Sequence, residues 1–137
     1  MKRLLILALL CATPAFADDE SNKFRSPSGN ILCLLETGDA GSTATCDILE
    51  RGTSATPRPR PKDCDLEWGI RYSVGESGAP EMICEGDFIG SAQSPILTYG
   101  STLQLGGIAC SSSEAGVECR NEQGHGFSLS KAIQKLF

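Results

Sequence analysis

The sequence predicts an all-β fold, a small disulfide-stapled antiparallel barrel or sandwich with a short C-terminal helical turn. Three observations favour this class. One long segment alternates between apolar and polar residues, about eight short candidate strands are separated by glycine-rich turns, and the cysteines are even in number once a predicted signal peptide is removed.

The alternating segment is Cys64–Val74, where every even position is apolar and every odd position is polar or glycine. Successive side chains of a strand point to opposite faces, so the pattern predicts one buried face and one exposed face. Gly69 lies in the middle of this unusually long run and predicts a bulge or bend. The face predicted to lie in the core, which includes the only tryptophan, carries Leu66, Trp68, Ile70, Tyr72 and Val74.

The N-terminus has the features of a cleaved secretion signal. A basic start precedes an apolar stretch over Leu4–Leu10, which is too short to span a bilayer, and Ala15-Phe16-Ala17 matches an A-x-A cleavage site. We therefore expect residues 1–17 to be a signal peptide and residues 18–137 to form a single β domain in the periplasm or outside the cell. No later run is apolar enough to predict a membrane span.

Charge and cysteine content limit the possible functions. Cleavage would remove two of the twelve basic residues and none of the seventeen acidic ones, leaving a net charge of −7. This charge repels phosphate backbones and anionic lipid, so we expect no nucleic-acid partner. Cleavage also removes Cys11, and the remaining six cysteines predict three disulfides, which leaves no thiol for catalysis or metal binding.

Two disulfides follow from candidate hairpins. Ile31–Leu35 and Thr43–Leu49 are predicted strands, and placing Cys33 opposite Cys46 centres the connection in a turn-rich loop. Facing cysteines on antiparallel strands meet the separation that a disulfide needs. The same construction pairs Cys110–Cys119 across a turn rich in serine and glycine.

The third disulfide, Cys64–Cys84, follows by elimination. The turn predicted at Gly75–Pro80 places Cys84 opposite Arg71 instead. Either the strand folds back near Gly69, or Cys64 reaches Cys84 from a neighbouring strand.

The two predicted hairpins begin alike. Gly29–Cys33 is similar to Gly106–Cys110, and each segment opens a hairpin with a predicted disulfide. Two short matches do not establish a duplication, and chance similarity between hairpins explains them better.

The remaining segments are shorter. Alternating prolines in Thr56–Lys62 predict an extended connector, and its basic residues are interpreted as solvated rather than as a partner site. Pro95–Tyr99, Ser101–Leu105 and Phe127–Leu129 are predicted short strands. Ser130 is predicted to cap a helical turn over Lys131–Phe137 that buries its large apolar side chains.

Candidate catalytic residues are few. His125, the only histidine, lies between two glycines, and Glu122 precedes it by three residues. The pair can be read as a general acid/base with its orienting partner, or as polar residues of a turn, which we favour. No serine lies in a G-x-S-x-G elbow, and one histidine cannot supply a zinc site. The sequence predicts no cofactor.

Outward-facing acids offer a second candidate site. Asp63, Asp65 and Glu67 share one face of the alternating segment, and Asp87 follows Cys84. If the third disulfide brings these carboxylates together, they can hold a hard cation such as Ca²⁺. Because the spacing lacks the EF-hand pattern, we favour a solvated acidic face and predict no metal.

Motifs spread along the chain carry a family resemblance. They are F-x-S-P-S-G-N-I-x-C from Phe24, D-C-x-L-x-W-G from Asp63, C-x-G-D from Cys84, L-T-Y-G from Leu97, G-V-x-C from Gly116 and G-H-G-F-x-L-S from Gly124. In this order they resemble an exported bacterial family of unknown function over nearly all of residues 18–137. The resemblance implies export and a disulfide-rich fold and brings no activity.

Two functions are consistent with these observations. We favour a non-enzymatic module that binds an envelope or extracellular protein, or a wall component, through loops on a β scaffold; an inhibitor of an exogenous hydrolase is one version. The alternative is a small hydrolase or lyase that uses His125 with Glu122. The sequence indicates neither the ligand nor the oligomeric state.

Overall fold

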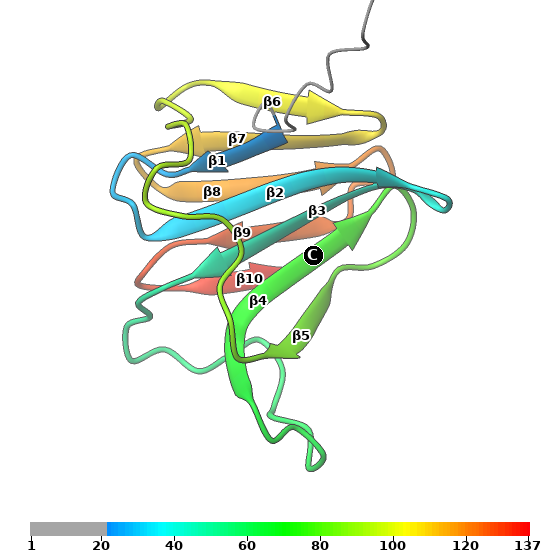
Figure 1. Ribbon diagram of the computed structural model, residues 1–137. Coiled ribbons are helices and arrows are strands. Elements are labelled where there is room, and N and C mark those ends of the chain that lie inside the picture. The colour runs from blue at the N-terminus through cyan, green and yellow to red at the C-terminus, as the bar shows by residue number, and fades with distance from the viewer. Residues whose placement is uncertain (1–21) are drawn as a thin grey trace, which may run out of the picture.

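Two five-stranded antiparallel sheets pack face to face in the computed structural model, which describes residues 22–137 (Figure 1). Sheet A has the order β1-β2-β3-β4-β5, and sheet B has the order β10-β9-β8-β7-β6. The predicted sandwich is confirmed, and in the described part of the chain the sheets do not close into a barrel. Sheet A contains β1 (Lys23–Arg25), β2 (Ile31–Gly38), β3 (Gly41–Ile48), β4 (Glu67–Gly75) and β5 (Glu81–Glu85). Sheet B contains β6 (Thr102–Leu105), β7 (Ile108–Ser113), β8 (Gly116–Asn121), β9 (Gly126–Leu129) and β10 (Gln134–Leu136).

Both sheets repeat one plan. In each, every strand pairs with the next one along the chain, and a disulfide joins directly opposed cysteines of the second and third strands. These disulfides are Cys33–Cys46 and Cys110–Cys119, the pairs and registers that the sequence predicted. The two similar segments that we attributed to chance therefore open structurally equivalent hairpins.

The core lies where the two hairpins meet. The Sγ atoms of Cys46 and Cys119 are 3.7 Å apart, so the two disulfides contact each other between the sheets. The rings of Tyr72 and Phe127 also meet across the sandwich, with centroids 6.0 Å apart. Burial raises the pKa of Tyr72 to about 12, and its hydroxyl donates to the Gly69 carbonyl at 3.1 Å.

The alternating segment enters this core only in part. Tyr72 and Val74 are buried and Trp68 and Ile70 are half-buried, but Leu66 is 52% exposed, so its predicted place in the core is wrong. Gly69 has φ +88°, and the pairing of β4 with β5 shifts register between Glu67 and Arg71, as expected for a bulge. Residues before this bulge leave the sandwich, which is why Leu66 does not lie between the sheets.

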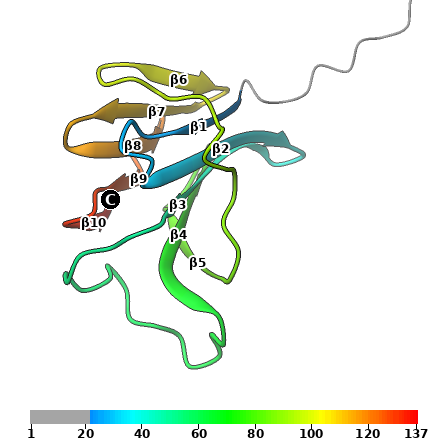
Figure 2. The same cartoon turned by 60° about the vertical axis from the view of Figure 1, so that its left-hand side comes forward.

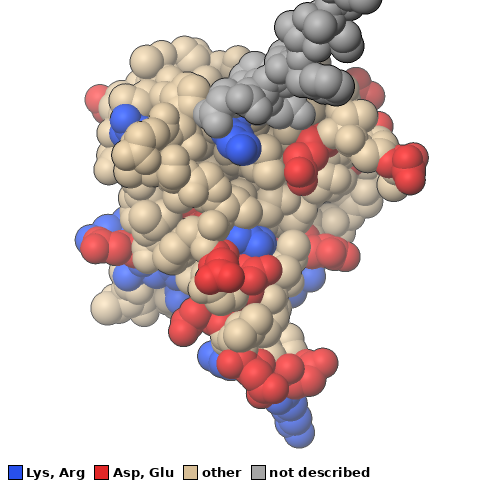
Figure 3. Space-filling view, viewed as in Figure 1, with Lys and Arg blue, Asp and Glu red and all other residues tan. Residues whose placement is uncertain are grey.

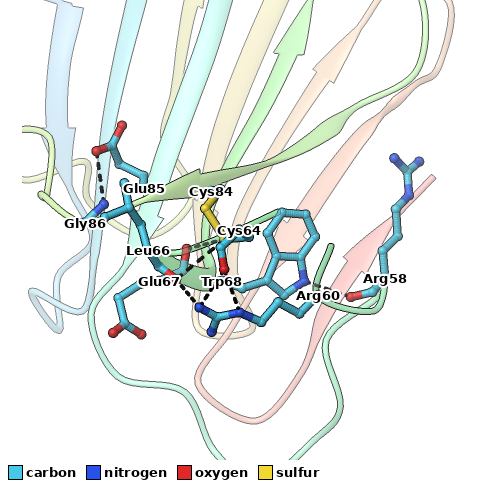
Figure 4. The surroundings of a disulfide bond; sticks show 9 residues. All are labelled: Arg58, Arg60, Cys64, Leu66, Glu67, Trp68, Cys84, Glu85 and Gly86. Atoms are coloured by element: carbon cyan, nitrogen blue, oxygen red, sulfur yellow. Dashed lines mark hydrogen bonds between the residues drawn. A yellow bond between two sulfur atoms is a disulfide. The ribbon is translucent and has the colours of Figure 1, made fainter. Parts of the chain in front are cut away.

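The third disulfide, Cys64–Cys84, forms as predicted and ties the loop before β4 to β5 (Figure 4). The chain turns back just before Cys64, whose N–H donates to the Pro61 carbonyl at 3.1 Å. Arg60 donates to the carbonyls of Cys64 and Leu66, at 3.0 and 2.6 Å from Nη2. The indole N–H of Trp68 donates to the Arg58 carbonyl at 3.0 Å. This loop projects from the sandwich in both ribbon views (Figures 1 and 2).

The predicted C-terminal helical turn is wrong. Residues 134–136 form β10, which pairs with β9, and Ile133 is exposed. Ser130 does cap a turn, since its Oγ accepts from the Ile133 N–H at 3.2 Å, but the chain then continues as a strand. The side chain of Gln134 is buried and accepts from Arg51 Nε at 2.9 Å, a contact between residues far apart in sequence.

The remaining predictions concern the segment before β6, membrane spans and the signal peptide. Pro95–Tyr99 is not a strand, and its one ladder contact is an isolated bridge between Ile96 and Arg25. Within residues 22–137 we find no helix with the length and apolar character needed to cross a bilayer. The predicted signal peptide, residues 1–17, lies outside the described residues.

Candidate functional site

A groove of about 580 Å³ lies at one end of the sandwich, on the left in Figure 1. We call this the open end. Both sheets contribute to the groove, because it is lined by the β1–β2 turn, the end of β3, the β7–β8 turn and the start of the β9–β10 turn. Tyr99, which lies shortly before β6, adds an aromatic ring.

The β1–β2 turn supplies a rigid polar wall. The Ser26 hydroxyl accepts from the Ile31 N–H at 3.1 Å and lies 3.1 Å from the Ser28 hydroxyl. The Asn30 amide donates to the carbonyl of Glu50 at 2.9 Å and accepts from its N–H at 2.8 Å. These polar groups are therefore held in place without a ligand.

Of the three charged side chains that line the groove, two form an ion pair with each other and the third has no partner within residues 22–137. Lys131 Nζ lies 3.0 Å from Glu50 Oε2, and both side chains are exposed. Such a pair contributes at most about 1 kcal/mol to stability, but it neutralises the only cation of the lining. Glu114 makes no hydrogen bond or ion pair within residues 22–137, so the lining has one unpaired negative charge.

Two large side chains at the groove face solvent. Tyr99 is 52% exposed and Leu49 is 41% exposed. Tyr99 lies on a turn that is fixed to β7, since Gly100 N–H donates to the Ser112 carbonyl at 2.8 Å and Ser112 N–H donates to the Ser101 carbonyl at 3.0 Å. The Tyr99 hydroxyl has no partner within the described residues.

Several motifs that carry the family resemblance meet at this groove. The motif residues that contribute to the lining are Ser26, Ser28–Ile31, Tyr99, Gly116 and Ser130. Sequence reasoning missed the groove because these are mostly short polar turn residues with no catalytic or metal-binding spacing. Their only signal was the motifs themselves, which are separated by long stretches of chain.

The predicted pair His125 and Glu122 lies at the opposite end, in the β8–β9 turn. Asn121 organises this turn, because its Oδ1 accepts from the N–H groups of Gln123 and His125 at 3.0 and 3.1 Å. In the part of the chain that the structure describes, the side chains of His125 and Glu122 make no hydrogen bond or ion pair, and neither lines the groove. The structure therefore does not combine them with the polar groups of the open end.

Side chains join the two sheets at this second end, which we call the closed end. The buried Asn121 amide donates to the carbonyls of Gly75 and Gly78, both at 3.0 Å, and Gln123 Oε1 accepts from the Gly78 N–H at 2.8 Å. The β4–β5 turn of sheet A is thus fastened to the end of β8 in sheet B.

Glu76 makes a further link at the closed end. Its Oε1 accepts from the Gly107 N–H at 3.0 Å, in the turn between β6 and β7. This bond, followed by bonds from Ser42, lowers the pKa of the Glu76 carboxyl. Sequence analysis missed this role because nothing local connects residue 76 with residue 107.

The predicted metal ligands are not brought together. Asp63, Asp65, Glu67 and Asp87 are all exposed, on a face whose acidic residues gather mainly on its lower part in Figure 3. Within residues 22–137, the one group of three or more candidate ligand atoms lying within 4.8 Å of one another is formed by cysteines. Those cysteines belong to Cys33–Cys46 and Cys110–Cys119 and are not thiolates.

A partly buried ion network explains part of the polar face of sheet A. Arg71 Nε lies 2.7 Å from Asp47 Oδ1, Arg71 Nη1 lies 2.9 Å from Glu85 Oε2, and Ile89 N–H donates to Asp47 Oδ2 at 2.7 Å. The Asp47 hydrogen bond raises the pKa of Arg71, and backbone N–H groups, chiefly that of Gly86, lower the pKa of Glu85. The network holds the loop after β5 against the sheet, so its role is structural.

The model of DUF6636, described as a family of unknown function, matches residues 4–137. No curated protein and no solved structure matches the chain.

Proposed function

The chain belongs to the DUF6636 family of unknown function, and we propose that this member is a non-enzymatic binding module whose ligand occupies the groove at the open end. Three disulfides indicate a protein that folds outside the reducing cytoplasm. The periplasm or the cell exterior, reached after cleavage of residues 1–17, is the location that we propose. Its ligand would be an envelope or extracellular protein or a wall component.

The groove carries this proposal. Its volume of about 580 Å³ lies within the range of about 300–1,000 Å³ that is typical of ligand sites. Loops from both sheets line it, and binding residues are commonly placed on loops that a rigid scaffold positions. The disulfides Cys33–Cys46 and Cys110–Cys119 join the strands that carry these loops, which supports a site held ready for its ligand.

The hydrogen bonds of the groove favour binding over catalysis. A serine nucleophile requires a base within hydrogen-bond reach. Within the described residues, Ser26 and Ser28 bond to each other and to backbone N–H groups, and Ser130 donates to the Ile133 carbonyl. Glu50 is engaged by Lys131. These groups present fixed donors and acceptors to a ligand rather than an activated nucleophile.

Site-specific photo-crosslinking in living cells tests the proposal. A crosslinking amino acid replaces Leu49 in the groove in one strain and Glu122 at the closed end in another; both positions are exposed. We expect the Leu49 position to give a reproducible crosslinked species, identifiable by mass spectrometry, and the Glu122 position to give none. Equal crosslinking from both positions, or none from Leu49 in a correctly folded protein, contradicts the proposal.

A further inference from the structure

We propose that the ligand of the groove is a carbohydrate chain built from neutral or amino sugars. This inference rests on the proposed function, because it assigns a chemical class to the occupant of the same groove. It follows from the aromatic ring, the fixed polar groups and the charge balance of the lining.

Tyr99 provides a surface for a sugar ring. One face of a pyranose presents C–H groups, which pack against an aromatic face, while a tyrosine hydroxyl can still hydrogen-bond at the wet end of the ring. Tyr99 is 52% exposed, and its hydroxyl has no partner within residues 22–137. The backbone next to it is fixed to β7 through Gly100 and Ser101, so binding orders little more than the Tyr99 side chain.

The remaining lining suits hydroxyl groups, which both donate and accept hydrogen bonds. Four serines line the groove, together with Asn30, whose amide is locked by two bonds to the backbone of Glu50. The Glu114 carboxylate is unengaged and can accept from a sugar hydroxyl or an ammonium group, which are strong bonds because the acceptor is charged. Short or fixed polar side chains keep the entropy cost of binding low.

Charge and polarity disfavour the other classes of ligand. The lining contains two carboxylates, Glu50 and Glu114, and one cation, Lys131, so its net charge is negative and disfavours a phosphate or an acidic polymer. A protein partner usually inserts aromatic or aliphatic anchors into an apolar pocket at the centre of an interface. Here the exposed large apolar groups are Leu49 and Tyr99, surrounded by hydroxyls and charges, which favours a carbohydrate over a protein segment.

The test uses the disulfide-bonded mature protein on an array of neutral, amino-sugar and acidic oligosaccharides. We expect binding to neutral or amino-sugar oligosaccharides and not to acidic ones. Tyr99→Ala should weaken this binding at least tenfold, and Glu114→Gln should weaken it several-fold. Phe88→Ala is the matched control, since Phe88 is 49% exposed but lies outside the groove, and it should bind like the wild type.

Each outcome of the binding tests either supports or contradicts the carbohydrate inference. Absence of binding to every neutral and amino-sugar oligosaccharide overturns it, as does binding that Tyr99→Ala leaves unchanged while the variant keeps the wild-type melting temperature. If the carbohydrate tests are negative and the crosslink from Leu49 captures a protein, the carbohydrate inference fails while the groove remains a binding site. Failure of both experiments overturns the proposed function as well.

Discussion

Turns between strands form both ends of the sandwich, but the two ends differ in the hydrogen bonds that join the sheets. At the closed end, Glu76, Asn121 and Gln123 reach across and bond to turns of the other sheet or to its strand ends. At the open end, no hydrogen bond within residues 22–137 joins the β1–β2 turn to the β7–β8 turn, and the groove lies between them. The sheets are linked there along the sides, where residues 50–52 meet residues 131–134 and where residues 95–101 bond to Arg25 of β1 and Ser112 of β7.

Side-chain length accounts for this difference. Both sheets follow the same strand order, so topology alone does not decide which end closes. The closed end carries long amide and carboxylate side chains, which span the space between the layers. The facing turns of the open end carry mainly serine and glycine, which cannot reach across. The open end is therefore available for a ligand, whereas the closed end contributes mainly to stability.

A matched pair of asparagines provides the strongest test of this comparison. Asn121→Ala removes four hydrogen bonds at the closed end and should lower the free energy of unfolding by about 3 kcal/mol. Asn30→Ala removes two bonds at the exposed open end and should cost about 1 kcal/mol. Urea unfolding measures both values, and crosslinking or carbohydrate binding should fall only in Asn30→Ala. Equal stability losses, or a binding loss in Asn121→Ala alone, would reverse the assignment of the two ends.

Acid should weaken the closed end through Glu76. Because folding lowers the pKa of this carboxyl below its ordinary value of 4.5, its contribution to stability is present above that value and is lost as the pH falls toward the folded-state pKa. Wild type should therefore melt at a higher temperature than Glu76→Gln at neutral pH, and the difference should shrink below pH 4.5. Calorimetry across this range measures the effect.

The control for this prediction lies at the open end. Glu114 has no hydrogen-bond partner within the described residues, so Glu114→Gln should melt like the wild type at every pH. A gap between wild type and Glu76→Gln that widens in acid would show that the Glu76 hydrogen bonds do not stabilise the folded state.

Two glycines in the left-handed conformation, one at each end, allow the ends to be compared with substitutions that introduce similar backbone strain. Gly29 has φ +77° in the β1–β2 turn, Gly78 has φ +85° in the β4–β5 turn, and a Cβ at either position would meet nothing within 4 Å. Alanine at each position should therefore cost about 1 kcal/mol of unfolding free energy from strain alone. Only Gly29→Ala should also weaken binding, because only Gly29 lines the groove. Reduced binding in Gly78→Ala at unchanged foldedness would argue for a site at the closed end.

His125→Ala should have the smallest effect. The side chain has no hydrogen-bond or ion-pair partner within residues 22–137, so its removal should change the free energy of unfolding by less than about 0.5 kcal/mol. The variant should restore every phenotype of a deletion strain to the wild-type level. A stable variant that fails to do so would revive the hydrolase or lyase alternative with Glu122.

Local rules predicted the hairpins and disulfides well. Cys33 and Cys46 lie on strands joined by one short turn, so the position of the turn fixes their register, and the same holds for Cys110 and Cys119. The bulge at Gly69 was also predictable from the sequence, because a glycine within an unusually long strand pattern indicates a bulge or bend.

Long-range contacts explain the errors. The C-terminal segment forms a strand because Leu129 and its neighbours in β9 offer a free edge for pairing. In addition, the buried Gln134 side chain accepts a hydrogen bond from Arg51, which lies in a loop distant in sequence. Leu66 lies outside the core because the Cys64–Cys84 disulfide holds the loop that contains Leu66 next to β5. The groove was unpredictable for the same reason, since segments as distant as residues 26–31 and 130–131 form it together.

Mapping amide chemical-shift changes on the folded protein tests the central claim most directly. Soluble neutral or amino-sugar oligosaccharides are titrated into the isotope-labelled, disulfide-bonded protein. The account predicts shifts at residues 26, 28–31, 49–50, 99, 113–114, 116 and 130–131, which line the groove, and none at the closed-end residues 75–78 and 122–125. Shifts centred on residues 75–78 and 122–125 would contradict the position of the site, and an absence of shifts with every oligosaccharide would contradict the carbohydrate ligand.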